Sequence, residues 1–214
     1  SRRRQRQMCI RDRNYILYEV FMCGRFSLSN SESVKSKFDV DVEARFNISP
    51  GTDVNILASG PLVLPWNLSP PWAKKPMNLI NARYETLHEK PSFRYTSRCV
   101  FIVDGWYEWK RFFDWKRREN KNQPYYHHLD GEIFFMAGVY NDSGCAIVTK
   151  AAVKELKNIH PRQPYLLLEN QISDWLSGDQ FIKDRCSSEI RIHKVSTYVN
   201  SPRNDSIECK TPIQ

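Results

Sequence analysis

The apolar residues of this chain come in short runs, and this pattern narrows the folds open to it. The runs have the length of β-strands and are interrupted every few residues by Gly, Pro, Asn, Asp or Ser. None approaches the roughly 18 apolar residues that a membrane-spanning helix needs. Phe, Trp and Tyr make up 13% of the chain, which is too aromatic for a disordered protein. A length of 214 residues suits one domain with a substantial core.

Strands and short helices alternate along the sequence. The predicted strands are residues 47–59, 61–68, 99–109, 132–141, 144–150 and 190–199, with Gly105 expected to end the run 99–109. The predicted helices are residues 31–40, 81–89, 151–159 and 169–178, the first capped by Ser29 and Asn30 and the last stopped by Gly178. Residues 132–141 and 144–150 should pair as a hairpin across Asp142–Ser143–Gly144. We therefore predict a single α+β domain with a mostly antiparallel, barrel-like sheet and peripheral helices.

Positive charge is concentrated at the amino terminus. The chain holds 32 Lys and Arg against 24 Asp and Glu, a formal net charge of +8, so a polyanionic partner is plausible. Residues 1–21 carry six Arg against Asp12 and Glu19, which is half of that charge. We expect residues 1–21 to be a basic extension that is non-native or removed, and residues 22–214 to form the domain.

Cysteine usage indicates a reducing compartment. The chain has six Cys, none in CxxC spacing, and no apolar core of a secretory signal near its amino terminus. This pattern predicts an intracellular protein with reduced thiols and no membrane association. The adjacent His127 and His128 would point to opposite faces of a strand, so they cannot share an ion. We expect no metal and no cofactor.

Four polar clusters lie in apolar or aromatic surroundings, at residues 22–26, 81–83, 104–109 and 159–162. Glu108 is flanked by aromatic residues, and a carboxyl group in such surroundings can hold a proton near neutral pH. That suits a general acid, although a structural ion pair would give the same pattern. His160 follows a predicted helix and precedes a proline, and a histidine held on a turn can be catalytic or structural.

Seven motifs in one order carry a family resemblance. They are MCGRF (22–26), WNLSPPW (66–72), NAR (81–83), DGWYEW (104–109), IVT (147–149), IHPRQP (159–164) and VNSPRND (199–205). From residue 22 to about residue 213 the chain resembles the SRAP family, the SOS response-associated peptidase fold. Members of that family are abasic-site processing proteins that crosslink to single-stranded DNA. The resemblance thus implies an abasic-site processing protein that shields such sites in single-stranded DNA, its main partner.

The resemblance assigns the nucleophile to Cys23, exposed by loss of Met22. An amino-terminal Cys carries an amine and a thiol on adjacent carbons, and the reference pKa of an α-amine is about 7.7–8.0. The amine can attack the aldehyde of an abasic site, and the thiol can close a thiazolidine. The pair Met8–Cys9 lacks the following Gly-Arg-Phe, so it does not compete with Cys23.

Other roles are implied motif by motif. Asn81 would orient the Cys and the sugar, Glu108 would shuttle protons, and His160 would assist aldehyde activation or strand elimination. Arg25 and Arg83 would contact phosphate, because a guanidinium meets phosphate oxygens with two parallel hydrogen bonds. Trp66 and Trp72 could stack on unpaired bases, although tryptophans of the core would give the same pattern.

Three functions remain open on the sequence. The first is a covalent crosslinking protein with possible lyase activity, which needs no partner subunit and is expected to be a monomer. The second is a peptidase or self-cleaving peptidase using Cys23, Glu108 and His160, which could itself release Cys23. The third is a non-covalent single-stranded DNA-binding module, whose affinity would fall with salt and would not depend on Cys23.

Overall fold

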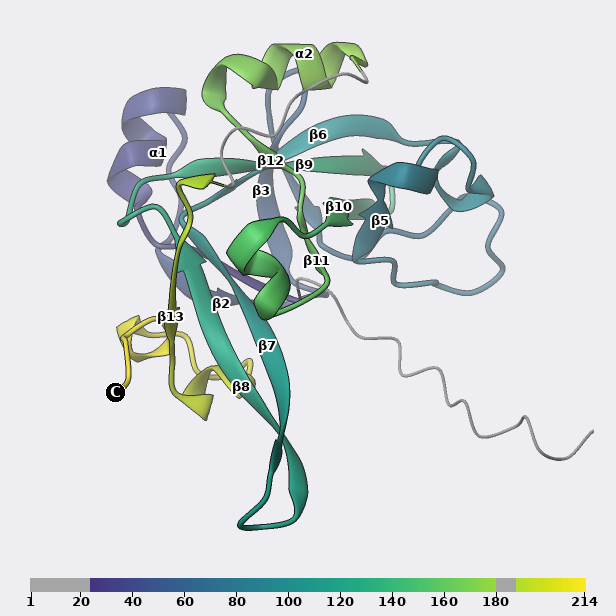
Figure 1. Ribbon diagram of the computed structural model, residues 1–214. Coiled ribbons are helices and arrows are strands. Elements are labelled where there is room, and N and C mark those ends of the chain that lie inside the picture. The colour runs from purple at the N-terminus through teal and green to yellow at the C-terminus, as the bar shows by residue number, and fades with distance from the viewer. Residues whose placement is uncertain (1–23, 180–187) are drawn as a thin grey trace, which may run out of the picture.

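Two open, mostly antiparallel sheets with short helices around them make up the protein (Figure 1). The computed structural model describes residues 24–179 and 188–214. Its strands are β1 (Arg25–Leu28), β2 (Arg45–Ile48), β3 (Asp53–Leu57), β4 (Pro61–Pro65), β5 (Asn81–Arg83), β6 (Ser97–Val103), β7 (Gly105–Asp114), β8 (Glu119–His128), β9 (Phe134–Asn141), β10 (Gly144–Ala151), β11 (Arg162–Pro164), β12 (Leu166–Leu167) and β13 (Arg191–Lys194). The α+β class is confirmed, and the barrel-like sheet takes the form of two open sheets.

Each sheet draws strands from distant parts of the chain. The first has the order β13-β8-β7-β1-β2 and the second the order β11-β10-β9-β6-β3-β4. In the second sheet β5 also pairs with β10, in parallel, and β12 pairs with β9. The predicted hairpin is confirmed, because β9 and β10 pair with Gly144 opposite Asn141.

The helices are short. They are the α-helices α1 (Ser31–Phe38) and α2 (Ile172–Ser177) and the 3-10 turns η1 (Tyr84–Thr86), η2 (Pro91–Phe93), η3 (Lys154–Asn158), η4 (Glu169–Gln171), η6 (Thr197–Asn200) and η7 (Ile207–Cys209). The side chain of Asn30 caps α1 by accepting a hydrogen bond from the Ser33 amide at 3.1 Å. Gly178 ends α2 in the left-handed conformation, with φ of 102°. Both predicted boundaries are confirmed. None of the described helices is long and apolar enough to span a membrane.

The predicted helix at 81–89 is wrong in its first turn. Asn81–Arg83 form strand β5, and only the 3-10 turn η1 follows. The partner is β10, along which Ala82 lies opposite Val148. Pairing with a strand so distant in sequence leaves no local signal. In the folded protein this pairing outweighs the local preference for a helix.

The predicted helix at 151–159 is also shorter than expected. Ala151 still belongs to β10, where it lies opposite Arg162 of β11, and the rest forms the 3-10 turn η3. The turn closes with the His160 amide donating to the Leu156 carbonyl at 3.2 Å. The strand pairing therefore takes residues that the helical pattern had assigned to the helix.

Gly105 begins a strand, where the sequence predicted an end. β6 stops at Val103 and β7 starts at Gly105, with the buried Asp104 between them. A Cβ on Gly105 would lie 2.2 Å from the ring of Tyr126, so a glycine is required by close packing. The carboxylate of Asp104 accepts hydrogen bonds from Ser29, from its amide at 2.8 Å and its hydroxyl at 2.6 Å.

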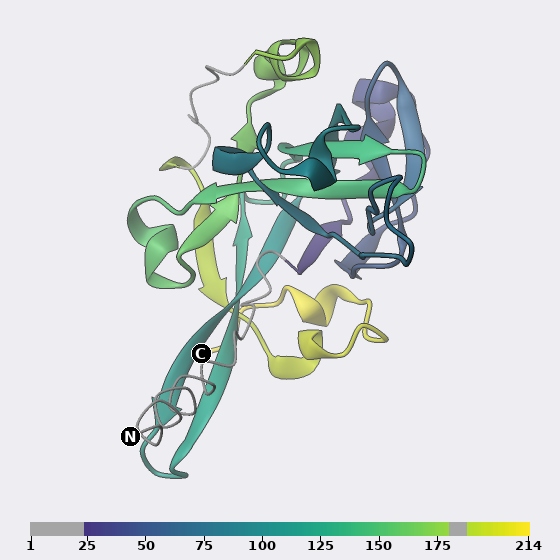
Figure 2. The ribbon, with the colours of Figure 1, turned by 90° about the vertical axis from the view of Figure 1, so that its right-hand side faces the viewer.

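The core lies where the two sheets meet. Phe26 of the first sheet packs against Trp66 and Phe101, with ring centroids 5.1 and 6.0 Å apart. All three rings are buried. The outer part of the β7–β8 hairpin does not share in this core: it projects away from both sheets, as two views at right angles show (Figures 1 and 2).

Candidate functional site

The pairing of β1 with β7 brings the first predicted site residues together. Arg25 lies opposite Tyr107 in this antiparallel ladder, so the amino-terminal end of β1 lies beside the next residue of β7, Glu108. Glu108 is buried, with an exposed fraction of only 3%. The residue that follows Cys23, Gly24, is thus held near a buried acid. Cys23 itself lies outside the described residues.

The guanidinium of Arg25 is engaged mainly by the protein. Its Nη1 donates to Asn47 Oδ1 at 2.9 Å and to the Val199 carbonyl at 2.8 Å, and its Nη2 donates to the Asn200 carbonyl at 3.2 Å. Arg25 therefore ties β1 to β2 and to the carboxyl-terminal segment. The Asn47 amide extends this tie by donating to the Ser201 carbonyl at 3.0 Å.

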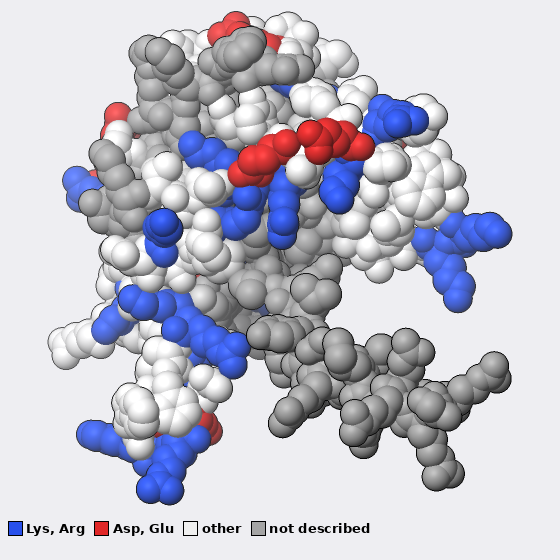
Figure 3. All heavy atoms as spheres, turned by 45° about the vertical axis from the view of Figure 1, so that its right-hand side comes forward, with Lys and Arg blue, Asp and Glu red and all other residues white. Residues whose placement is uncertain are grey.

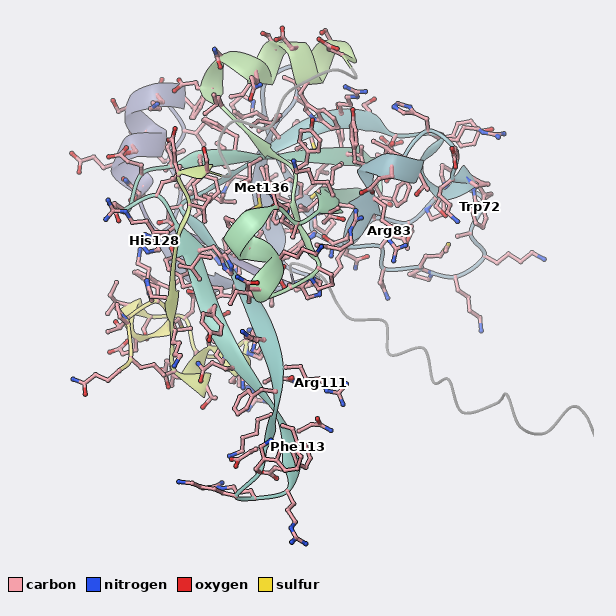
Figure 4. The ribbon with its side chains drawn as sticks, viewed as in Figure 1. Trp72, Arg83, Arg111, Phe113, His128 and Met136 are labelled. Atoms are coloured by element: carbon pink, nitrogen blue, oxygen red, sulfur yellow. The ribbon has the colours of Figure 1, made fainter. Side chains whose placement is uncertain are left out.

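The NAR motif reaches a second group of site residues through β10. Asn81 lies opposite Ile147 and Arg83 opposite Thr149. Asn81 is half-buried, whereas Arg83 is exposed and lies on the outer side of the sheet (Figure 4). An exposed guanidinium is accessible to an anionic ligand in solvent, with which its planar fork can form two parallel hydrogen bonds.

His160 has one ring nitrogen engaged and one without a partner. Its Nδ1 lies 3.1 Å from the Arg162 carbonyl, to which it can donate, and 3.2 Å from the Arg162 amide. Its Nε2 is buried with no hydrogen-bond partner among the described residues. Burial lowers the pKa of the imidazole below 6.5, so the ring is neutral at pH 7. A buried, unpartnered nitrogen is costly for folding, and such atoms are often kept for chemistry.

The side chain of Arg162 holds the histidine segment against η1 and β10. Arg162 makes a bidentate contact with Glu85, Nη1 to Oε1 at 2.8 Å and Nη2 to Oε2 at 2.9 Å. Its Nη2 also donates to the Thr149 carbonyl at 2.6 Å. Burial alone would raise the pKa of Glu85, but hydrogen bonds from Arg162 and the Ala151 amide outweigh it and leave the pKa below 4.5.

Sequence reasoning did not single out these positioning residues. Arg162, Thr149 and Asn200 stand inside the motifs IHPRQP, IVT and VNSPRND, so the motifs themselves held the signal. Glu85 stands two residues after NAR, and its pairing with Arg162 has no local signature. The η3–β11 segment that carries His160 lies beside the root of the β7–β8 hairpin in both views (Figures 1 and 2).

The two tryptophans proposed to stack on bases differ in their exposure to solvent. Trp66 is fully buried, and its Nε1 donates to the Ile80 carbonyl at 2.8 Å, so its ring offers no face to a base. Trp72 is 52% exposed and lies on the loop between β4 and β5, at the edge of the molecule (Figure 4). Of the two, Trp72 is therefore the remaining candidate.

The described cysteines are free thiols in apolar surroundings. Cys99, Cys145 and Cys209 are buried and form no disulfide, and burial raises the pKa of the Cys145 thiol to about 12. Cys9, Cys23 and Cys186 lie outside the described residues. In residues 24–179 and 188–214, no three His, Cys, Asp or Glu side chains gather closely enough to hold a metal ion.

The fold is one that solved structures share. A crystal structure of a protein from Bacteroides thetaiotaomicron superposes with a TM-score of 0.70 at 21% identity, covering 88% of this chain and 100% of that one. A phage-related protein from Bordetella bronchiseptica gives a TM-score of 0.63 at 24% identity, covering 81% and 94%. These structures thus place the chain in a class of α+β proteins that share this two-sheet fold.

Comparison of sequences identifies the family within that class. The model of the SOS response associated peptidase (SRAP) family matches residues 22–202, and the chain belongs to this family. The abasic site processing protein YoaM of Bacillus subtilis is 30% identical over 223 residues, covering 87% of this chain and 96% of that protein. YedK of Escherichia coli, also named an abasic site processing protein, is 31% identical, covering 90% and 100%. Mouse HMCES, of the same name, is 26% identical, covering 72% and 58%.

Proposed function

We propose that this protein processes abasic sites in single-stranded DNA by bonding covalently to them through Cys23. The observation that carries the proposal is the β1–β7 register, which holds Gly24 beside the buried Glu108. A nucleophile one residue before Gly24 would have a proton carrier within its reach. Membership of the SRAP family and the names of the relatives support DNA as the substrate. We infer that the protein acts inside the cell, as a single chain.

The proposed reaction begins with cleavage of the Met22–Cys23 peptide bond by water. The freed α-amine of Cys23 attacks the aldehyde carbon of the open-chain sugar, and loss of one water gives an imine. The Cys23 thiol then adds to the same carbon, and its proton passes to the nitrogen. This closes a five-membered thiazolidine, and the balance needs neither oxidant nor reductant.

Proton transfer in these steps falls to Glu108 and His160. Glu108 would protonate the departing hydroxyl and take up the amine proton, since it is a buried acid of β7 beside the amino-terminal end of β1. With Nδ1–H donating to the Arg162 carbonyl, the neutral imidazole of His160 has its buried Nε2 unprotonated and available as a base. Asn81 would hold the sugar, and the exposed Arg83 would pair with a flanking phosphate.

A denaturing gel tests the proposal directly. Protein beginning at Met22 is mixed with a single-stranded oligonucleotide carrying one abasic site, after mass spectrometry has confirmed that Met22 is removed. We expect a heat-stable shifted band that is lost in Cys23→Ser and slowed at least tenfold in Glu108→Ala. The matched control is Cys186→Ser, because that cysteine belongs to none of the motifs.

The same preparations separate the alternatives. A folded protein with a free amino-terminal Cys23 that gives no band would contradict the proposal. Hydrolysis of peptides that depends on Cys23 would then favour the peptidase. Reversible, salt-sensitive binding that is equal in wild type and Cys23→Ser would favour the plain binding module.

A further inference from the structure

The outer part of the β7–β8 hairpin, residues 110–121, is the most charged described segment, and we call it the hairpin tip. It contains six Lys and Arg against Asp114 and Glu119. From Met22 onward the chain has a formal net charge of +4, and the hairpin tip accounts for all of it. Lys and Arg side chains gather with uncharged ones at this projecting end, at the lower left of Figure 3.

Three large aromatic side chains of the hairpin tip face solvent. Trp115 is 83% exposed, Phe112 43% and Phe113 41%. The rings of Phe113 and Trp115 meet edge to face, with centroids 4.8 Å apart. Exposed aromatic rings together with cations form the surface on which single-stranded nucleic acids stack.

The two faces of the hairpin tip differ in charge. On one face Phe112 lies opposite Lys121, whose ammonium pairs with Asp114 at 2.9 Å and with Glu119 at 3.5 Å. On this face, which we call the paired face, the ammonium of Lys121 is therefore neutralised.

The other face carries its cation without an acid in the ladder. Phe113 lies opposite Asn120, and Arg111 lies opposite Asn122. Arg111 and Phe113 follow one another along the projecting part of β7 (Figure 4). We call this face, with Trp115 resting against Phe113, the open face.

The turn at the end of the hairpin is ordered by one carboxylate. Asp114 Oδ1 accepts hydrogen bonds from the amides of Lys116 at 3.0 Å and Arg117 at 3.2 Å. Arg118 completes the turn with φ of 53°, a left-handed conformation. Because this turn holds its own shape, a ligand would not have to order it on binding.

We propose that the open face of the hairpin tip binds unpaired DNA. Bases would stack on Phe113 and Trp115, and phosphates would pair with Arg111 and with the arginines of the turn. The proposal rests on the proposed function for the identity of the strand, namely the one that carries the abasic site.

The geometry of β7 sets the distance between this contact and the site. Trp115 follows Glu108 by seven positions along an extended strand, or roughly 23 Å at about 3.3 Å per residue. A stacked strand advances about 3.4 Å per nucleotide, so the hairpin tip reaches about seven nucleotides from the abasic site. It would hold the flanking strand and leave the reacting sugar alone.

Undamaged DNA tests the contact without any covalent chemistry. Fluorescence anisotropy of a labelled single-stranded 25-mer compares wild type with the double variant Phe113→Ala/Trp115→Ala. Stacking contributes about 1–3 kcal/mol per base, so we expect the double variant to bind at least tenfold more weakly. The matched control is Phe112→Ala, a neighbour of nearly equal exposure on the paired face, which should change affinity less than twofold.

Salt dependence tests the charged part of the open face. Losing one phosphate contact lowers the slope of log affinity against log salt by about 0.7 for single strands. We expect that decrease for Arg111→Gln and no change for Lys110→Gln, which lies on the paired face.

A second experiment tests whether the hairpin tip contacts the strand that flanks the abasic site. Oligonucleotides with one abasic site and flanks of 3 or 12 nucleotides are compared at subsaturating concentration. The double variant should slow crosslinking of the long substrate alone. Absence of crosslinking in wild type would contradict the proposed function. The proposal for the hairpin tip would then be tested by the anisotropy measurement alone.

Several results would overturn the proposal. One is equal affinity of the double variant and wild type for the 25-mer, and another is an equal loss in Phe112→Ala. If the double variant loses as much affinity for a duplex 25-mer, the rings do not select unpaired DNA. Sedimentation that finds a wild-type dimer dissociated by the double variant, with DNA affinity unchanged, would assign the open face to a second copy of the chain.

Discussion

The strand β7 has two ends that use the same residue types in opposite ways. At its root Trp106 is 1% exposed and stacks on His127, with ring centroids 4.5 Å apart and planes 17° apart. Just beyond its outer end Trp115 is 83% exposed and touches only a neighbouring ring among the described contacts. The root is covered by the second sheet and the tip is not. Burial of an aromatic residue is therefore decided by what packs over the strand, and the residue type alone does not decide it.

The largest expected difference between the two ends is in the free energy of unfolding when the tryptophan at each end is replaced. Trp106→Ala should lower the free energy of unfolding by about 3–5 kcal/mol, because it empties part of the core. Trp115→Ala should change it by less than about 0.5 kcal/mol, because the ring is in solvent. Urea unfolding followed by circular dichroism measures both. Similar losses in the two variants would show that the hairpin tip is packed against the body.

Acid should weaken the root through His127. Burial lowers the pKa of this ring from 6.5 to about 3, so the folded protein keeps it neutral while the unfolded chain binds a proton. Stability is then complete above pH 6.5 and falls as the pH drops toward 3. At pH 4.5 the loss from this residue should be about 2–3 kcal/mol.

His127→Phe tests the origin of that slope. The variant cannot titrate, and it also removes a buried Nδ1 that has no hydrogen-bond partner among the described residues. Urea midpoints between pH 7 and pH 4.5 should fall less steeply than in wild type. The control is His88→Gln, at an exposed position, which should keep the wild-type slope. An unchanged slope in His127→Phe would assign the acid sensitivity elsewhere.

Gly105→Ala should disturb the root by a smaller amount. Its Cβ would lie 2.2 Å from Tyr126, whose hydroxyl lies 2.8 Å from that of Ser27 inside a buried network. Overpacking of this kind costs about 1–3 kcal/mol. Gly60→Ala is the control, since a Cβ there meets nothing within 4 Å. If both variants unfold at the same urea concentration, close packing at Gly105 is not required.

The smallest effect concerns the paired face of the hairpin tip. The hydrogen bond from Lys121 is the main reason that the pKa of Asp114 lies below 3.8. Lys121→Gln should raise that pKa toward its ordinary value, as a carboxyl NMR titration would measure, without shifting the urea midpoint. Lys110→Gln should leave the pKa of Asp114 where it is. A large loss of stability in Lys121→Gln would make this ion pair structural.

Local signals predicted the parts of the fold that local interactions determine. The cap at Asn30, the stop at Gly178 and the β9–β10 hairpin all depend on neighbouring residues, and all three are confirmed. The NAR segment depends on β10, a partner outside its own neighbourhood, and the helix predicted there was wrong. Trp66 and Trp72 show the same limit, because only the folded core separates them.

The sequence could propose candidate residues for the site but could not predict how they are arranged. Motif order singled out Glu108, Asn81 and His160, whose assigned roles stay predictions. The contacts that position the site could not be read from spacing: Arg25 binds the carboxyl-terminal segment, and Arg162 binds Glu85. Such pairs join residues far apart in the chain, and a single sequence does not indicate which distant residues lie close together in the fold.

The pairing of β1 with β7 also sets an order of events during synthesis. Arg25 leaves the ribosome well before its ladder partner Tyr107, and at about 5–20 residues per second the wait is roughly 4–16 s. Until then the amino-terminal end of β1 has no acid beside it. The segment with His160 and Arg162 emerges later still, so a half-made chain cannot complete the site. On the proposed function, the newborn protein would therefore not have both proton-transfer residues until most of its length has been translated.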